Sequence, residues 1–110
     1  MQAERLKILL SLREEEPEEA FHWYALAMEY LRTDQQEAFV LLQEAVRRFP
    51  TYLASYYQLA SIQLAMESYD DAKITAEEGI RLAVDLQNTK AQKELKALLQ
   101  QILDEMMFDE

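Results

Sequence analysis

Few side chains in this chain could do chemistry, and their spacing does not assemble a catalytic site. His22 is the only histidine among 110 residues, and no cysteine is present. Nucleophilic cysteine chemistry, disulfides and thiolate metal sites are therefore excluded. His22 could in principle act as a general base or a metal ligand. Its position beside Trp23 in an apolar stretch is instead typical of a structural or surface histidine.

Carboxylates are the second candidate for chemistry. Glutamates surround Pro17 in the segment 14–19, where they could hold Ca²⁺ weakly. Their spacing lacks the Asp, Asn and Gly positions of a calcium loop, and no histidine or cysteine completes another metal site. The single glycine, Gly79, excludes a glycine-rich phosphate loop. We therefore expect no enzyme activity, no cofactor and no metal, and interpret the glutamates as a solvated helix start.

The composition indicates a helical, acidic protein. One Gly and two Pro are too few for the turns of a sheet protein, while half of the residues are hydrophobic. The formal net charge of −10 disfavours nucleic acid and membranes as partners and favours basic or apolar protein segments, unless it serves solubility alone. No targeting signal is visible, and the lack of cysteine fits a reducing compartment, so we expect a cytoplasmic protein.

Apolar spacing and polar breaks predict six helices. Their expected ranges are 3–14, 18–32, 36–49, 52–66, 71–85 and a last helix that reaches 108. Pro17 and Pro50 end the first and third helices, Asp70 is the expected N-cap of the fifth, and Asn88 or Thr89 that of the last. The second helix is apolar on nearly every side. It must be covered on two sides, or one face is free for a partner.

Two segments of the chain repeat one pattern of large and small apolar residues. The first copy carries Trp23, Leu26, Ala27, Tyr30, Ala38, Leu42, Ala45 and Pro50. The second copy carries Tyr56, Leu59, Ala60, Gln63, Ala72, Ala76, Gly79 and Val84. The offset is 33 residues for the first four positions and 34 for the rest. Such a period marks an array of helical hairpins that share one continuous core, with small residues where helix axes come close.

This pattern resembles the tetratricopeptide repeat, over about residues 20 to 84. The departures are mild, since Gln63 replaces the usual Tyr and Val84 the usual Pro. The resemblance implies an all-α fold of antiparallel helical hairpins, stacked as a short right-handed array with an extra helix at each end. We expect a single domain over 1–110. Its parts are an N-terminal helix (1–16), repeat 1 (20–52), repeat 2 (53–86) and a C-terminal capping helix (87–108).

In tetratricopeptide proteins the first helix of each repeat lines a concave groove that binds proteins. The resemblance assigns to this groove Phe21, Tyr24, Met28, Leu31 and Arg32 from the first copy, and Ala54, Tyr57, Gln58, Ser61 and Ala65 from the second. This aromatic, Met-rich face suits a helix or an extended apolar segment. A clamp of Lys, Asn and Arg serves some members in binding acidic chaperone tails. It is absent here, with only Arg32 nearby.

The expected function is therefore a protein-interaction module, such as an adaptor, assembly factor or chaperone-like protein. Its groove would capture an apolar or basic segment of a protein or peptide. Two alternatives remain open at this point. The same face could join two copies as a structural homodimer, or the first or last helix of the chain could cover the groove from within.

Overall fold

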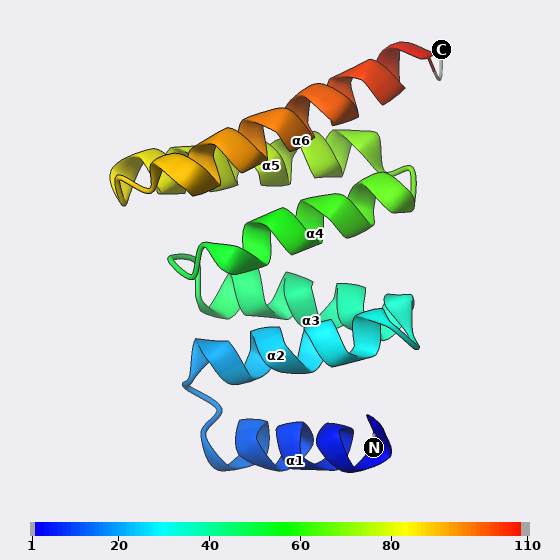
Figure 1. Ribbon diagram of the computed structural model, residues 1–110, viewed down its shortest axis with the longest axis vertical. Coiled ribbons are helices and arrows are strands. Elements are labelled where there is room, and N and C mark those ends of the chain that lie inside the picture. The colour runs from blue at the N-terminus through cyan, green and yellow to red at the C-terminus, as the bar shows by residue number, and fades with distance from the viewer. Residues whose placement is uncertain (1, 109–110) are drawn as a thin grey trace. The chain divides into compact units, whose positions relative to one another are not determined.

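Every regular element in the part of the chain that the structure describes is an α-helix (Figure 1). The structure is a computed structural model that describes residues 2–108. The helices are α1 (Gln2–Glu15), α2 (Ala20–Leu31), α3 (Gln35–Arg48), α4 (Ala54–Ala65), α5 (Tyr69–Asp85) and α6 (Thr89–Phe108). Their ends lie within two residues of the predicted ranges, which confirms the all-α prediction. None of the helices searched is long and apolar enough to cross a membrane.

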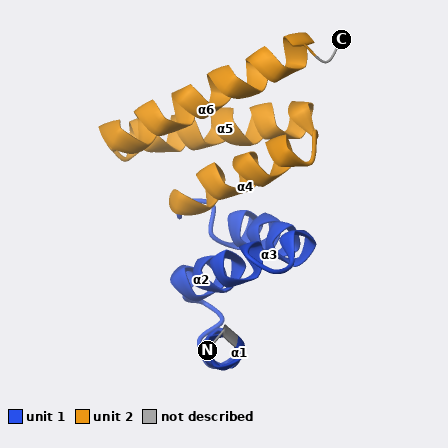
Figure 2. Ribbon diagram, turned by 45° about the vertical axis from the view of Figure 1, so that its right-hand side comes forward, with its two compact units in different colours: residues 1–52 blue, residues 53–110 orange. Residues whose placement is uncertain are grey.

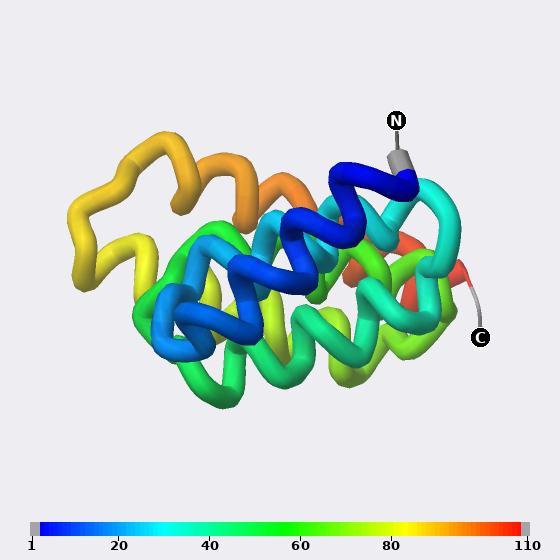
Figure 3. The backbone as a smooth tube through the Cα atoms, turned by 90° about the horizontal axis from the view of Figure 1, so that it is seen from below, coloured from blue at the N-terminus to red at the C-terminus, as the bar shows by residue number. Residues whose placement is uncertain are grey.

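The helices group into two compact units, Met1–Tyr52 and Leu53–Glu110 (Figure 2). In unit 1, α2 and α3 form an antiparallel hairpin, and α1 packs against α2. Figure 3 shows α1 running antiparallel to α2. In unit 2, α4 and α5 form the second hairpin, and α6 packs against both of its helices. Each unit is thus one hairpin with one additional helix.

Most of the residues that repeat along the sequence lie in the core of each hairpin, whereas Tyr30 is half-buried and Pro50 and Val84 are exposed. In unit 1 the buried apolar side chains are Trp23, Leu26, Ala27, Ala38, Leu41, Leu42 and Ala45. In unit 2 they are Tyr56, Leu59, Ala60, Ile62, Ala72, Ala76, Ala83, Leu95, Leu98 and Ile102. Burying one Leu or Ile stabilises the fold by about 1.5–3 kcal/mol, so these positions dominate the stability of each unit.

Helices of unit 2 come close together at Gly79 of α5. A Cβ atom on Gly79 would lie 2.9 Å from Cβ of Tyr56 and 3.1 Å from Cδ1 of Leu95. Carbon atoms in contact normally stay about 3.5–4.0 Å apart. The small residue predicted at this repeat position is therefore required by the contact of α5 with both α4 and α6.

Two of the helix starts have a side-chain cap. Asp34 accepts a hydrogen bond from the backbone N–H of Glu37 at 3.1 Å, and Asn88 accepts one from Ala91 at 3.0 Å. The cap at Asn88 is one of the two predicted for α6. The predicted cap at Asp70 is wrong, because α5 begins at Tyr69 and Ser68 is its N-cap residue.

The turns of unit 2 use a left-handed residue that is not glycine. Glu67 has φ 61° between α4 and α5, and Gln87 has φ 57° between α5 and α6. After each of them, an N–H bonds back five residues, from Ser68 to the carbonyl of Gln63 at 2.8 Å and from Asn88 to that of Ala83 at 2.9 Å. These bonds are those of the Schellman motif. The motif brings the chain around earlier than expected, which explains why α5 starts before Asp70.

Candidate functional site

Four of the predicted groove residues of the first copy line one open pocket between α1 and α2. This α1–α2 pocket has a volume of about 430 Å³ and is lined by Arg5, Leu9, Phe21, Tyr24, Ala25, Met28, Glu29 and Arg32. Its size falls in the range of about 300–1,000 Å³ that is typical of ligand pockets. Phe21 remains 54% exposed, although it is a large apolar side chain. Leu31, the fifth predicted residue, is half-buried and does not line this pocket.

Contacts around Trp23 position α1 beside this face of α2. The indole Nε1 of Trp23 donates a hydrogen bond to the carbonyl of Pro17 at 2.9 Å, which fixes the turn between the two helices. The guanidinium carbons of Arg13 and Arg48 lie 5.1 Å and 4.7 Å from the centre of the Trp23 ring. Arginines at this distance are attracted to the aromatic face. Trp23 therefore joins α1, the turn and α3 at one point.

His22 has a structural role at the same turn. Its Nε2 atom lies 2.8 Å from Oε1 of Glu16, while Nδ1 is buried without a hydrogen-bond partner among the described residues. In the same part of the chain, no group of three or more His, Cys, Asp or Glu side chains could hold a metal ion. The histidine thus supports the α1–α2 turn, and the glutamate run around Pro17 supplies its partner.

The aromatic wall of the pocket continues from α2 into the segment after α3. The ring centres of Tyr24 and Tyr52 lie 5.8 Å apart, and the ring planes meet at an angle of 55°. Aromatic pairs prefer such a tilted arrangement to a face-to-face one. Partial burial raises the pKa of Tyr52, and the nearby Tyr24 and Glu19 add to this effect. The Tyr52 hydroxyl therefore stays neutral at physiological pH and presents an uncharged, amphipathic surface.

The local charge of the α1–α2 pocket is opposite in sign to that of the whole chain. Its lining contains two arginines and one glutamate, an excess of one positive charge, whereas the chain carries −10. Arg5 makes a loose ion pair with Glu29 at 3.7 Å. Arg32 is exposed and has no ion pair within the described residues. One positive charge next to the aromatic wall is thus available to a ligand.

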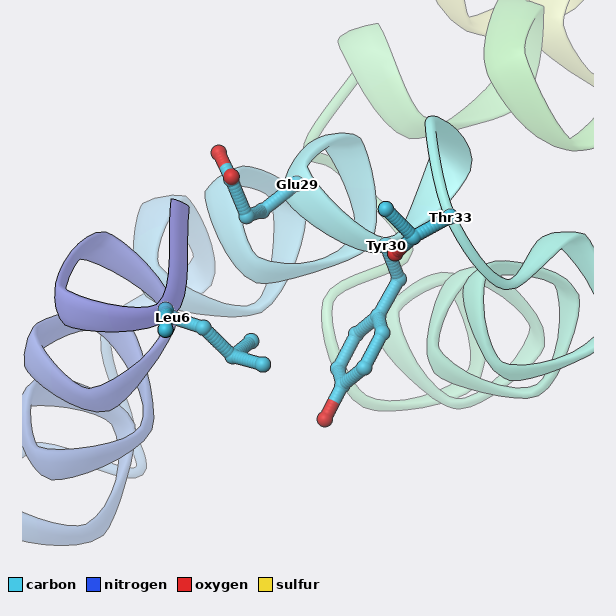
Figure 4. A pocket seen from close by; sticks show the side chains of 5 residues that line it. Leu6, Glu29, Tyr30 and Thr33 are labelled. Atoms are coloured by element: carbon cyan, nitrogen blue, oxygen red, sulfur yellow. The ribbon is translucent and has the colours of Figure 1, made fainter. Parts of the chain in front are cut away.

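A smaller hollow of about 210 Å³ lies between α1 and the last turn of α2 (Figure 4). It is lined by Ala3, Leu6, Glu29, Tyr30 and Thr33. Leu6 projects from α1 into this space, and Tyr30 borders it from α2 (Figure 4). Glu29 lines both this hollow and the α1–α2 pocket. The first helix therefore borders the groove face of α2 and leaves space on it, so it covers this face only in part.

The predicted groove residues of the second copy lie on α4, and three of them, Tyr57, Ser61 and Ala65, line a pocket in unit 2. This α4–α6 pocket has a volume of about 340 Å³ and is lined by Tyr57, Ser61, Leu64, Ala65, Leu98 and Gln101. Tyr57 is 39% exposed. Ala54 is exposed and Gln58 half-buried, and neither lines the pocket. Leu98 and Gln101 of α6 had not been predicted for the site, because α6 does not keep the repeat register: Lys93 and Glu94 stand where the repeat would place Leu and a small residue.

Among known proteins, the similarity of this chain is to solved structures. No family profile matches the sequence, and no curated protein matches it. The tetratricopeptide repeat domain protein from Salinibacter ruber is similar in its crystal structure, with 30% identity and a TM-score of 0.74 over 76% of this chain and 96% of that one. Its solution NMR structure gives 33% identity and a TM-score of 0.74 over 78% of this chain and 88% of that one.

A more distant structure has a similar fold. The TPR2B domain of yeast Sti1, in its complex with pHsp70, has a TM-score of 0.86 at 18% identity, over 94% of this chain and 84% of that one. The repeated core residues, the helical hairpins and the identity to the Salinibacter ruber protein all agree. This chain belongs to the tetratricopeptide repeat family.

Proposed function

We propose that this chain is a protein-interaction module that captures an apolar segment of another protein against α2. The observation that carries the proposal is the α1–α2 pocket, in which Phe21 stays 54% exposed beside Tyr24 and Met28. Clusters of exposed aromatic and Met side chains commonly mark interaction surfaces. The α4–α6 pocket, with Tyr57 and Ser61, is the second contact surface in this proposal.

The chemistry of the proposed segment follows from the pocket lining. Tyr24 and Met28 suit apolar side chains, while Arg5 and Arg32 favour an acidic neighbour over the basic one that the net charge indicates. Yeast Sti1 provides a precedent for a ligand on this fold, because its TPR2B domain forms a complex with pHsp70. Since Tyr24 and Met28 stand where a chaperone-tail clamp would need polar groups, we propose a partner other than a chaperone tail.

In this proposal, different segments of the chain have different roles. The hairpins α2–α3 and α4–α5 correspond to the two proposed repeats, 20–52 and 53–86. The extra helices, within 1–16 and 87–108, each supply one wall of a pocket, α1 through Arg5 and Leu9 and α6 through Leu98 and Gln101. We propose the cytoplasm as the site of action, since a chain without cysteine suits a reducing compartment.

Selection of peptides tests this function directly. A phage-displayed library of short random peptides is panned against the chain, and enriched peptides are titrated by fluorescence anisotropy. We expect apolar peptides with acidic residues, and a loss of affinity of about tenfold or more in the Tyr24→Glu variant. Val40→Glu is the matched control, because Val40 is 47% exposed on α3 and lies outside the pocket lining.

One result of this experiment would contradict the proposal. If Tyr24→Glu keeps its helical circular dichroism spectrum, and binds the enriched peptides as tightly as Val40→Glu does, the α1–α2 pocket is not the binding site. Sedimentation at several concentrations examines the homodimer through the same face. In that case Tyr24→Glu converts a dimer into a monomer, and the enriched peptides compete with dimerisation.

A further inference from the structure

The last turn of α6 presents apolar side chains that the described chain leaves uncovered. Met107 is 75% exposed and Phe108 is 87% exposed, whereas the preceding Met106 packs against the core of unit 2. Toward this end α6 diverges from α5 (Figure 1). Two adjacent large apolar side chains in water favour a contact that removes them from solvent.

The same end of the chain is acidic. Residues 104–110 contain Asp104, Glu105, Asp109 and Glu110, and the last basic residue of the chain is Lys96. Asp104 accepts a hydrogen bond from Nε2 of Gln100 at 3.0 Å, and Glu105 is exposed. We call residues 104–108 the tail turn. It combines an apolar knob with negative charge.

The α1–α2 pocket has the complementary properties. Its wall is apolar and aromatic, with Leu9, Tyr24 and Met28, and its lining carries the excess positive charge of Arg5 and Arg32 over Glu29. Two copies of a chain with a net charge of −10 repel each other. A contact between two copies is therefore most favourable where one of them offers a positive surface to an acidic one.

We propose that the α1–α2 pocket of one molecule binds the tail turn of a second copy of this chain. The proposal rests on the proposed function, because it uses the same pocket and names a partner for it. Met107 and Phe108 fill the apolar part of the pocket, and the acidic residues of the tail turn face Arg32. Because the pocket and the tail turn are different surfaces, the contact is head-to-tail and joins the pocket of one copy to the tail turn of the other. A pocket of about 430 Å³ that holds one helical turn gives a small interface, and small interfaces associate weakly.

A mixing experiment with two defective chains distinguishes this contact from a same-face dimer. Tyr24→Glu disables the pocket and leaves the tail turn intact, while Phe108→Glu disables the tail turn and leaves the pocket intact. Sedimentation velocity is measured over a concentration series for the wild type, for each variant and for an equimolar mixture with one chain fluorescently labelled. Val40→Glu and Leu86→Glu are the controls, since these residues are 47% and 51% exposed and line neither pocket.

The expected result is specific to the head-to-tail arrangement. The wild type and both controls associate with rising concentration, each defective variant alone stays monomeric, and their mixture forms a dimer that grows no further. Raising the NaCl concentration weakens the association, because exposed opposite charges are screened. In the mixture, adding Arg32→Glu to the Phe108→Glu chain, which supplies the pocket, also weakens the association. Adding Glu105→Arg to the Tyr24→Glu chain, which supplies the tail turn, then restores part of the loss.

Other results overturn the proposal. A wild type that stays monomeric throughout the series refutes it, and so does a Phe108→Glu chain that dimerises alone, which indicates the same-face dimer. A chain that binds the phage-selected peptides through Tyr24, yet does not associate with its own copies, loses this inference and keeps the proposed function. If it neither binds the peptides nor associates, both fail.

Discussion

Adding one methyl group at Gly79 tests whether helix packing or helix propensity decides the stability of unit 2. In an exposed helix interior, replacing Gly with Ala stabilises by about 1 kcal/mol. Gly79 is buried in the interior of α5, and the added Cβ would lie 2.9 Å from Cβ of Tyr56. Propensity and packing therefore predict opposite signs for Gly79→Ala.

The magnitude follows from the atoms that would have to move. Cβ of Tyr56 is attached to the α4 backbone, so relief of this contact requires a shift of α4 against α5 rather than a rotation of a side chain. The two Cδ atoms of the buried Leu95, at 3.1 and 3.2 Å, would crowd the added methyl group as well. Overpacking of this kind costs about 1–3 kcal/mol. After subtracting the gain in propensity of about 1 kcal/mol, we expect Gly79→Ala to lower the free energy of unfolding by up to about 2 kcal/mol.

Urea denaturation measures this change, and an unchanged slope m shows that the transition keeps its character. Ala97→Gly in α6 is the matched control, because Ala97 is exposed and reports propensity alone, with an expected loss of about 1 kcal/mol. In a Leu95→Ala background the additional penalty of Gly79→Ala should shrink, since two of the close contacts are gone. A Gly79→Ala chain that is more stable than the wild type would refute the close approach of these helices.

Three further predictions concern caps and charges. Asn88→Ala removes the side-chain cap of α6 and should lower the free energy of unfolding in urea by about 1 kcal/mol. Gln87→Gly should raise it by about 0.5–1 kcal/mol, because Gln87 has φ 57° and glycine adopts this conformation without the steric penalty. Hydrogen bonds from Arg47 and Arg48 lower the pKa of Glu44 from 4.5 to about 2. The stabilisation from Glu44 is thus complete above pH 4.5 and is lost as the pH falls through about 2. An NMR titration of the Glu44 carboxyl carbon should show this depressed midpoint, and high salt should raise the midpoint because it screens the two arginines.

The sequence predicted the hairpin cores well because one physical requirement governs them. Where two helix axes come close, only a small side chain fits, so Ala27, Ala38, Ala60 and Ala72 can be recognised by their spacing and are all 0% exposed. The helix ends were predictable for a similar local reason. Pro17 and the cap at Asn88 act within a few residues of their own position.

The pockets were predicted only in part, because their second wall comes from a helix outside the repeats. The resemblance placed Tyr24 and Met28 in a groove, and they line the α1–α2 pocket. It could not show that Leu98 and Gln101 would line the α4–α6 pocket, since α6 has no repeat register from which to assign its faces. The contacts of Arg13 and Arg48 with the Trp23 ring were not predicted, because they depend on three helices that meet only in the folded chain.

The two extra helices are held by different forces, and this difference affects the two pockets. α6 buries Leu95, Leu98 and Ile102, each contributing about 1.5–3 kcal/mol. No described side chain of α1 over 3–15 is fully buried. Its leucines are only half-buried, and the hydrogen bond of the Trp23 indole to Pro17 and the aromatic contact of Arg13 add about 1 kcal/mol each. The wall that α1 gives to its pocket is therefore the more easily displaced, and a ligand there can adjust it, whereas the α6 wall is fixed by the core.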